Sequence, residues 1–373
     1  MEIKEVVSKE DWKSFLKLPW HIYKGNPFWV PPLLEDEKFR LNTKKNPFYQ
    51  HAQAKSFISV KDGKILGRIA GIIDENYINT HREKTGFFGF FECLSHYELA
   101  NALFLAVKDW LKKQGIHYLM GPFNPSINET CGLLIEGFDK RPCFMMPYNH
   151  PYYVEFVERF GMEKAIDLFA YETKTEQNKA MSRLSSLIER LHKRYPEVRV
   201  RSLNLKRIDE EIKIIKNIFN NAWEENWGFT PLTDEEVESM AKRLKPLIVP
   251  DLVSIGEYKG EPFGLILFLP DYNQVFQHIN GRLFPFGWLK FFWHVRKIDR
   301  IRGLLLGVKH KYQKTGLVPF LFYKSWRKIL EKGHYKCVEL SWALENNFSV
   351  LRSAKGLNPT LTKVYRIYKM KIK

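Results

Sequence analysis

The sequence contains only four cysteines in 373 residues: Cys93, Cys131, Cys143 and Cys337. None of them forms a C-x-x-C pair, so their spacing argues against a structural zinc site and a disulfide framework, and it favours a reducing compartment. The chain also lacks an unbroken apolar stretch of membrane-spanning length. Its first residues are charged and contain no apolar signal segment. We therefore expect a cytoplasmic protein that needs no metal.

Acidic residues are also in short supply. The chain has 59 Lys and Arg against 42 Asp and Glu, which gives a formal net charge of +17. This excess predicts an anionic partner, and nucleic acid, an anionic membrane surface and a polyanionic cofactor would all satisfy it. Aromatic residues make up 15% of the chain. That share favours large apolar pockets or a surface that meets a membrane.

The stretch from Gly303 to Lys332 organises the second half of the chain. It reads as an apolar strand at Leu304–Val308, a polar loop ending in QKTG at 313–316, and a helix from about Val318. The strand has no polar alternation, so we expect it to be buried on both faces. A glycine in the loop would let the backbone turn. A strand, an amide-rich loop and a helix N-terminus bind phosphates, because free N–H groups and the helix dipole converge there.

The order of predicted elements repeats along the chain. Each half contains a β-hairpin, and the hairpins share the glycine spacing of Gly63/Gly67 and Gly260/Gly264. Such self-similarity predicts two copies of one α/β unit. A polar run from Glu172 to Lys179 precedes a long predicted helix. We place the domain boundary there, which gives domains 1–175 and 176–373.

Several segments resemble a known family. Val308, Gln313 and Gly316 follow the acyl-CoA pyrophosphate loop of the GNAT superfamily, V-x-x-x-x-Q/R-x-x-G-x-G/A, although Val318 takes the place of the last small residue. Longer phrases resemble the bacterial ceramide synthase-like branch of this superfamily: NPFYQHA, GPFNPSINETCGLLIEGFD, MMPYNHPYY and ELSWALENN. The resemblance implies tandem GNAT-like α/β domains with mixed, mostly antiparallel sheets flanked by helices. It also implies acyl transfer from a CoA thioester to an amine, in the founding case a sphingoid base.

The resemblance implies acyl-CoA as cosubstrate, bound by the second domain. The residues expected to hold it are Val308, Gln313, Lys314, Thr315, Gly316, Leu317 and, after the fifth strand, Asn346. At the equivalent place the first half has Glu92-Cys93-Leu94-Ser95 and no Gln-x-x-Gly. We therefore expect the first domain to have lost CoA binding and to serve the acceptor or the acyl chain.

Acyl transfer to an amine requires a neutral amine and a proton for the leaving thiolate. The candidate bases are His278, in a predicted strand, and Glu129, in an Asn-rich loop. Where many GNAT enzymes have a Tyr that protonates the thiolate, this chain has Arg352, Ser353 and Ala354, so Tyr365, or else Tyr368, on the last strand is the candidate acid. A structural role is the alternative for each of these candidates.

Loops of the first half hold further polar residues that we predict to bind the acceptor: Asn124, Asn128, Tyr148 and Asn149. Residues 283–298 mix Trp, Phe, Lys and Arg as an interfacial membrane helix does. The alternative is a buried helix that lines an acyl pocket. The first interpretation would attach the protein peripherally to the inner face of the membrane.

We predict an acyl-CoA-dependent N-acyltransferase that acts on a lipid-like or amphiphilic amine. One alternative is aminoacyl-tRNA-dependent transfer, as in tandem-GNAT peptidoglycan-branching enzymes. Another is a non-catalytic basic module that binds membranes or RNA. The loop at 313–316 argues against the tRNA-dependent reaction, because that reaction needs no CoA loop. Nucleic acid is accordingly the less favoured partner.

Overall fold

The structure is a computed structural model that describes residues 1–175, 179–347 and 359–372. The contacts of the chain divide it into two compact units. Unit 1 consists of Met1–Phe169, Val275–Trp293 and Thr362–Lys373, and unit 2 of Ala170–Gln274 and His294–Leu361. The predicted boundary lies near the first change of unit. Two later segments, however, belong with unit 1, and the roles given to the two domains stay a prediction.

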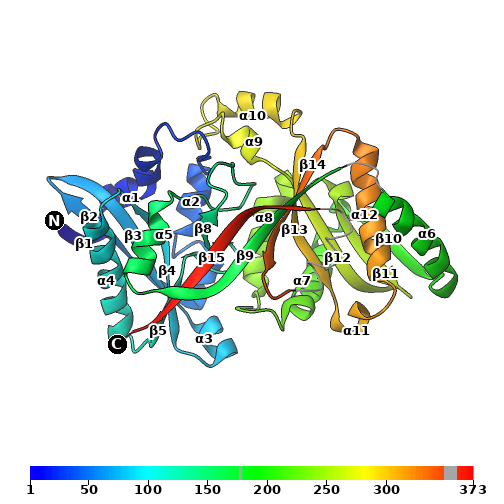
Figure 1. The fold of residues 1–373 in the computed structure, drawn as a ribbon, viewed down its shortest axis with the longest axis horizontal. Helices are drawn as coiled ribbons and strands as arrows, with labels where there is room; N and C mark the ends of the chain where they lie inside the picture. The colour runs from blue at the N-terminus through cyan, green and yellow to red at the C-terminus, as the bar shows by residue number, and fades with distance from the viewer. Residues whose placement is uncertain (176–178, 348–358, 373) are drawn as a thin grey trace. The chain divides into compact units, whose positions relative to one another are not determined.

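Unit 1 is built on a mixed sheet (Figure 1). Its strand order is β1 (Glu2–Glu5), β2 (Ala52–Lys61), β3 (Lys64–Asp74), β4 (Thr85–Cys93), β5 (Tyr118–Gly121), β15 (Thr360–Lys371), β9 (Glu163–Lys174), with β8 (Leu133–Glu136) also paired to β15. The β4–β5 pair is parallel, whereas β1–β2, β2–β3, β3–β4 and β5–β15 are antiparallel. The last strand of the chain therefore completes the sheet of the first unit. Two short strands, β6 (Phe123–Asn124) and β7 (Thr130–Cys131), pair separately.

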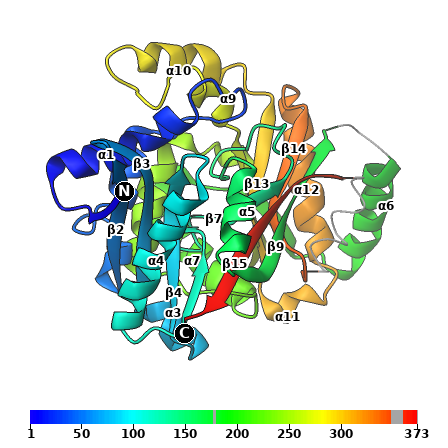
Figure 2. The same ribbon diagram turned by 60° about the vertical axis from the view of Figure 1, so that its left-hand side comes forward.

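Helices cover both faces of this sheet. They are α1 (Lys9–Ile22), α2 (Leu34–Arg40), α3 (Glu75–His81), α4 (Tyr97–Lys113) and α5 (Tyr152–Arg159). A Cβ on Gly71 of β3 would lie 2.7 Å from the Trp110 ring of α4. Three positions earlier, Arg68 donates to the Phe15 carbonyl of α1 (2.9 Å), so α1 and α4 lie on opposite faces. The main apolar core forms between the sheet, α4 and α5, which share one face (Figure 2).

Unit 2 repeats this arrangement. Its strand order is β9, β14 (Cys337–Leu344), β13 (Arg300–Val308), β12 (Glu261–Pro270), β11 (Val253–Tyr258), β10 (Val198–Ser202), and its larger helices are α6 (Lys179–Arg194), α7 (Ile208–Trp223), α8 (Asp234–Leu244) and α12 (Val318–Lys332). A Cβ on Gly264 would contact Leu321 of α12, and one on Gly307 would contact Trp223 of α7. Because Gly264 pairs with Val308, the neighbour of Gly307, α12 and α7 cover opposite faces.

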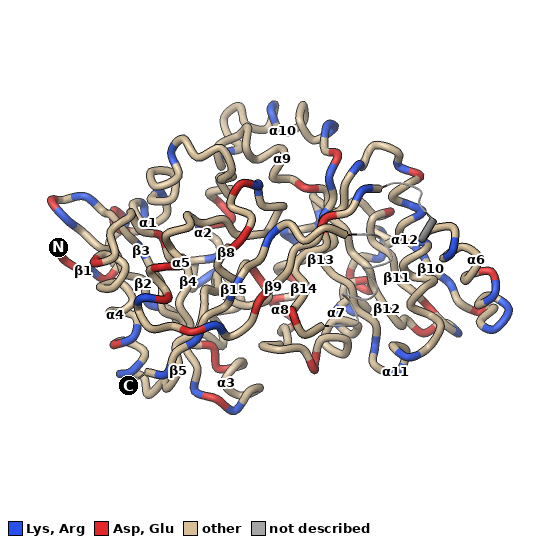
Figure 3. Tube along the Cα trace, in the orientation of Figure 1, with Lys and Arg blue, Asp and Glu red and all other residues tan. Residues whose placement is uncertain are grey.

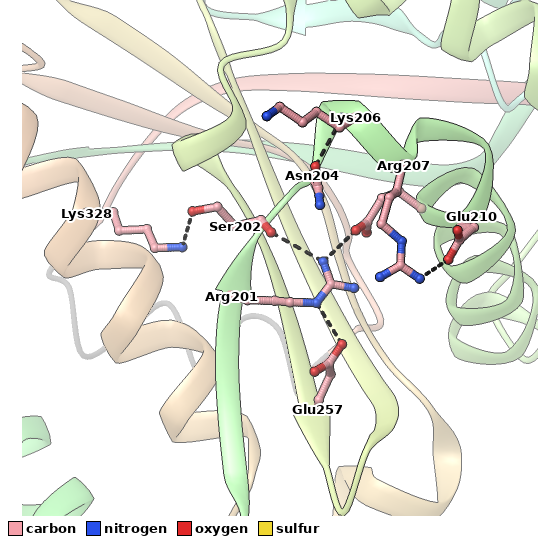
Figure 4. Close-up of polar contacts among 9 residues, drawn as sticks. Arg201, Ser202, Asn204, Lys206, Arg207, Glu210, Glu257 and Lys328 are labelled. Atoms are coloured by element: carbon pink, nitrogen blue, oxygen red, sulfur yellow. Dashed lines mark hydrogen bonds and ion pairs between the residues drawn. The ribbon is translucent and has the colours of Figure 1, made fainter.

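A polar network fixes the outer edge of unit 2 (Figure 4). Arg201 of β10 donates to Glu257 of β11 (2.7 Å) and to Glu211 of α7 (2.6 Å). Lys328 of α12 donates to the Ser202 hydroxyl (2.9 Å). These bonds join the edge strand to the next strand and to a helix on each face. Arg201 is thus a structural residue.

The predicted fold class is confirmed, and both predicted hairpins form with positive φ at their turn residues, Asp62–Gly63 and Lys259–Gly260. The strand predicted around His278 is wrong, because α9 (Asn273–Phe276) and turns occupy that segment. Helix α10 (Gly287–Val295) is shorter than the predicted 283–298. Within the described ranges, no helix is both long enough and apolar enough to cross a membrane.

Candidate functional site

The sheet of unit 2 opens between its two parallel strands. Over the described residues, β13 and β14 are paired only from Arg300↔Cys337 to Gly303↔Leu340. The register of β13 against β12 shifts at the next position, where Leu304 forms a bulge. Gly303 to Leu306 are accordingly half-buried, which corrects the expectation of a strand buried on both faces. The bulge and the loss of pairing leave the carboxyl ends of these two strands unpaired in the described structure, beside half-buried leucines, and we call this unpaired stretch the opening of unit 2.

Residues 309–317, which include the short helix α11 (His310–Gln313), join this strand to α12. The Gln313 side-chain amide donates to the Val308 carbonyl (3.0 Å), and the Thr315 hydroxyl donates to the Tyr312 carbonyl (2.6 Å). Both side chains thus shape the loop itself. Helix α12 begins after Leu317, its N-cap residue, with no side-chain capping bond. Pro319 has no N–H, and the Phe320 N–H donates to the Leu317 carbonyl (3.1 Å), so in this first turn the Val318 N–H is the group that remains available to an anion.

The lysines of this loop are not equivalent. Lys309 and Lys311 both approach Glu261 of β12, at 3.7 and 2.6 Å. The hydrogen bond from Lys311 lowers the pKa of Glu261, so this carboxylate stays ionised and offsets part of the positive charge. Lys314 is exposed and has no ion pair with any residue in the described part of the chain. It is the lysine best suited to meet a phosphate.

Gly316 lies in a turn, as expected, although its φ is not in the left-handed region. Its lack of a side chain also matters for packing. A Cβ at this position would lie 2.9 Å from Leu191 of α6 and 3.0 Å from the Tyr195 ring. The glycine therefore allows α6 to approach the loop closely.

Unit 1 contains the same opening but fills it. In the described structure its parallel strands β4 and β5 are paired only from Thr85↔Tyr118 to Phe87↔Met120, and a register shift follows near Phe90, whose φ is 51°. The Asn124 side-chain oxygen accepts a hydrogen bond from the Phe90 N–H (2.5 Å). A Cβ on Gly89 would collide with the Phe123 carbonyl oxygen, so β6 lies directly against β4. Only residues 94–96 connect β4 to α4.

Other predicted acceptor residues also make structural contacts. The Asn149 side chain accepts from the Leu134 N–H (2.7 Å) and donates to the Leu134 carbonyl (3.1 Å), as a paired strand would. The Tyr148 hydroxyl donates to the Phe138 carbonyl (3.1 Å). Asn128 is half-buried in the turn between β6 and β7. Their assignment to the acceptor stays a prediction.

The three candidate catalytic residues all belong to unit 1. The Glu129 carboxylate lies 3.6 Å from the buried Arg40, and its side chain is 9% exposed. Tyr365 is fully buried on β15, opposite Leu134 of β8. His278 is exposed, in the turn after α9. Burial favours a structural role for Glu129 and Tyr365, while Asn346 is exposed in unit 2 after β14.

The structure also reveals a group that the sequence reasoning missed as a functional candidate. The Glu92 Oε2 atom accepts hydrogen bonds from the hydroxyls of Tyr23 (2.7 Å) and Tyr153 (2.8 Å). Burial of this carboxyl raises its pKa to about 7. The available signal was a single carboxylate at the end of the apolar strand GFFGFFEC. Its partners lie far away in the sequence, so no local motif pointed to the cluster.

Two curated relatives match almost the whole chain. Protein YghO of Escherichia coli (strain K12) is 34% identical over 376 residues, which cover 99% of this chain and 95% of the relative. The bacterial ceramide synthase of Caulobacter vibrioides (strain NA1000 / CB15N) is 36% identical over 363 residues, which cover 95% and 94%. The chain belongs to the bacterial ceramide synthase family. It is therefore an N-acyltransferase of the GNAT type.

Solved structures support the fold of this family member. A tandem GNAT protein from the clavulanic acid biosynthesis pathway matches 100% of this chain and 99% of its own, with a TM-score of 0.58 at 10% identity. At that identity the likeness concerns the fold alone. No protein-family model matches the chain.

Proposed function

We propose that this family member transfers an acyl group from acyl-CoA to a lipid-like primary amine. The C–N bond of an amide forms, the C–S bond of the thioester breaks, and the thiol leaves with a proton. The observation that carries the proposal is the opening beside Leu304–Leu306, which adjoins an uncapped helix N-terminus and the exposed Lys314. This arrangement offers an apolar wall to an acyl–pantetheine arm and a positive site to a pyrophosphate.

The name of the Caulobacter relative supports a long-chain amine as acceptor. An amine of this kind enters water poorly, so an enzyme that uses it would benefit from contact with a membrane. Helix α10 and the turn before it expose large apolar side chains to an unusual extent: Phe284 79%, Phe286 70%, Trp288 43%, Leu289 51%, Phe292 63%, Trp293 68%. Their exposure supports the membrane interpretation of this segment over a buried pocket wall.

Basic residues accompany these aromatic ones, including Lys290 within α10 and Arg296 and Lys297 after it (Figure 3). Aromatic rings favour the interfacial region of a bilayer, and each basic residue near an anionic surface adds about 1 kcal/mol. We propose that α10 attaches the enzyme reversibly to an anionic membrane at the cytoplasmic face.

The reaction is tested by incubating the purified protein with palmitoyl-CoA and a C18 2-amino-1,3-diol. We expect an N-acyl amide by mass spectrometry and one free thiol for each amide formed. Aminoacyl-tRNA should not replace the thioester. A protein that forms the amide only from aminoacyl-tRNA, or releases thiol without forming an amide, would exclude the proposed reaction.

The membrane proposal is tested by flotation with vesicles that contain 30% anionic lipid. Wild type should float, and a Trp288→Ala, Trp293→Ala variant should remain largely at the bottom. Replacement of the exposed Leu105 on α4 by Ala serves as the control, since it removes apolar surface elsewhere. Equal flotation of wild type and the double variant would show that α10 is not the attachment site.

A further inference from the structure

The Glu92 carboxylate is the centre of an unusual cluster in unit 1. One of its oxygens holds both tyrosine hydroxyls, while Oε1 has no hydrogen-bond donor among the described residues. Tyr153 also accepts the Cys93 N–H (2.7 Å), and the Tyr152 hydroxyl donates to the Cys93 carbonyl (2.9 Å). The glutamate side chain is therefore fixed at the end of β4 and retains partial exposure.

No cation in the described part of the chain forms a close ion pair with this carboxylate, although the Arg68 charge lowers its pKa. Arg68 is directly opposite Glu92 in the β3–β4 register, but its guanidinium donates to the Phe15 carbonyl (2.9 Å) and lies over the Phe15 ring, 4.9 Å from its centroid. Arg68 and Glu92 form no ion pair within 4.0 Å in the described structure. The Arg68 charge lowers the Glu92 pKa but does not offset the effect of burial, so the carboxylate remains costly to ionise and keeps one free oxygen. A ligand that supplies the cation would remove this cost.

Aromatic rings line the cluster on one side. Trp29, Tyr23, His150 and Tyr152 form a stacked column with successive centroid separations of 5.0, 4.7 and 5.1 Å and interplanar angles of 13–16°. The Tyr23 hydroxyl at the middle of this column is one of the donors to Glu92. Stacking covers both faces of Tyr23 and of His150, so within the column the outer faces of Trp29 and Tyr152 are the ones that could attract an ammonium group.

We propose that Glu92 and the Trp29–Tyr23–His150–Tyr152 column form the binding site for the ammonium head group of the amine substrate. The inference rests on the proposed function and names the place in unit 1 that recognises the acceptor. The free Glu92 oxygen accepts hydrogen bonds from the R–NH3⁺ group, and the edges of the stacked rings contact its α-carbon and first substituents. A neutral amide, which carries no positive charge, binds poorly here, so the acylated product leaves.

The site predicts a pH dependence of amine binding. Glu92 has a pKa of about 7, so the carboxylate is lost as the pH falls through that value and binding weakens. The charged groups that act on it are Arg68, which lowers its pKa, and Glu37 of α2, which raises it. Tyr23, Tyr152 and Tyr153 stay neutral because burial raises the pKa of each hydroxyl. Burial also raises the Cys93 pKa and lowers the His150 pKa, so neither carries charge near pH 8.

The test is calorimetric titration at pH 8 with a soluble C8 2-amino-1,3-diol and its N-acetyl derivative. Wild type should bind the amine at least about tenfold more tightly than the derivative, and Glu92→Gln should lose that preference. The glutamine still accepts both tyrosine hydrogen bonds, so the fold should persist. Glu136→Gln, at an exposed position on β8, is the matched control and should bind as wild type does.

Titration with palmitoyl-CoA separates this inference from the proposed function. Glu92→Gln should bind palmitoyl-CoA as wild type does. Equal amine affinity in wild type and Glu92→Gln, equal affinity for the N-acetyl derivative, or no amine binding at all would each overturn the ammonium site. Absence of palmitoyl-CoA binding in wild type would instead refute the proposed reaction, on which the ammonium site rests.

Discussion

The two units of this chain build the same opening and use it differently. In both, two parallel strands separate after three or four paired residues, next to a shift in the neighbouring register. In unit 1 the two residues of β6 occupy the opening. In unit 2 half-buried leucines lie beside the corresponding opening. Duplication of a fold therefore does not duplicate its site. A single segment placed between the strands is enough to remove it.

The connections that follow the two strands differ as well. Unit 2 has residues 309–317 before α12, with room for a phosphate loop, whereas unit 1 has only residues 94–96 before α4. The Leu94 N–H is already bonded to the Leu66 carbonyl (3.0 Å). The comparison therefore supports the proposal that unit 2 binds the anion and that unit 1 holds another ligand.

The largest effect should come from the strand that completes unit 1. Tyr368 of β15 is 1% exposed and belongs to the core formed with α4 and α5. Tyr368→Ala should lower the free energy of unfolding by about 3–5 kcal/mol, because it removes a large buried ring. Leu361→Ala, on the same strand but 43% exposed, should change it by less than about 1 kcal/mol. Denaturant unfolding measures both, and equal effects would contradict this role of β15.

Strand β6, which occupies the opening of unit 1, should contribute to stability but not to the affinity for palmitoyl-CoA. Asn124→Ala would leave the Phe90 N–H without its acceptor, at a cost of about 1–3 kcal/mol. Palmitoyl-CoA affinity should stay within about twofold of wild type. Asn101→Ala, which removes only a 3.4 Å bond from the Tyr97 hydroxyl, is the control for stability. A large loss of palmitoyl-CoA affinity in Asn124→Ala would break the contrast between the units.

The charge of the unit 2 loop should show in binding. Lys314→Glu should weaken palmitoyl-CoA binding about tenfold, or about 1.4 kcal/mol, because it places a carboxylate beside the expected pyrophosphate. Lys324→Glu changes the net charge equally at an exposed position further along α12 and should have little effect. Equal weakening by the two variants would mean that net charge, and not this loop, attracts the ligand.

The smallest expected effect is a pH dependence of unit 1. The folded-state pKa of Glu92 is about 7 against an ordinary value of 4.5, so protonation favours the folded state. Wild type should therefore lose stability relative to Glu92→Gln as the pH rises from about 4.5 to 7, and the difference should stay constant above that. Partial exposure reduces the expected difference to about 1 kcal/mol. Thermal unfolding of both proteins at pH 4.5 and pH 8 measures this difference. The same difference at both pH values would contradict a raised pKa of Glu92 in the folded state.

Much of the fold could be predicted because it depends on local patterns. The hairpins needed only their glycine turns, and α12 only its apolar spacing after the loop. The pairing of β15 with β5 and the contact of Asn124 with Phe90 join distant positions, which no local periodicity encodes. The Glu92 cluster was not predicted for the same reason, because its members are distant in the sequence. Gly316 is the converse case. The sequence pointed to it as a loop residue, but only the structure shows that its lack of a side chain lets α6 pack against the loop.

The central claim is that acyl-CoA binds to unit 2 at the opening beside β13 and to no matching place in unit 1. Hydrogen-exchange mass spectrometry with and without palmitoyl-CoA tests it directly. We predict slower exchange in peptides that cover residues 304–318 and unchanged exchange in peptides that cover 89–97. Protection of 89–97 with no change at 304–318 would contradict the account.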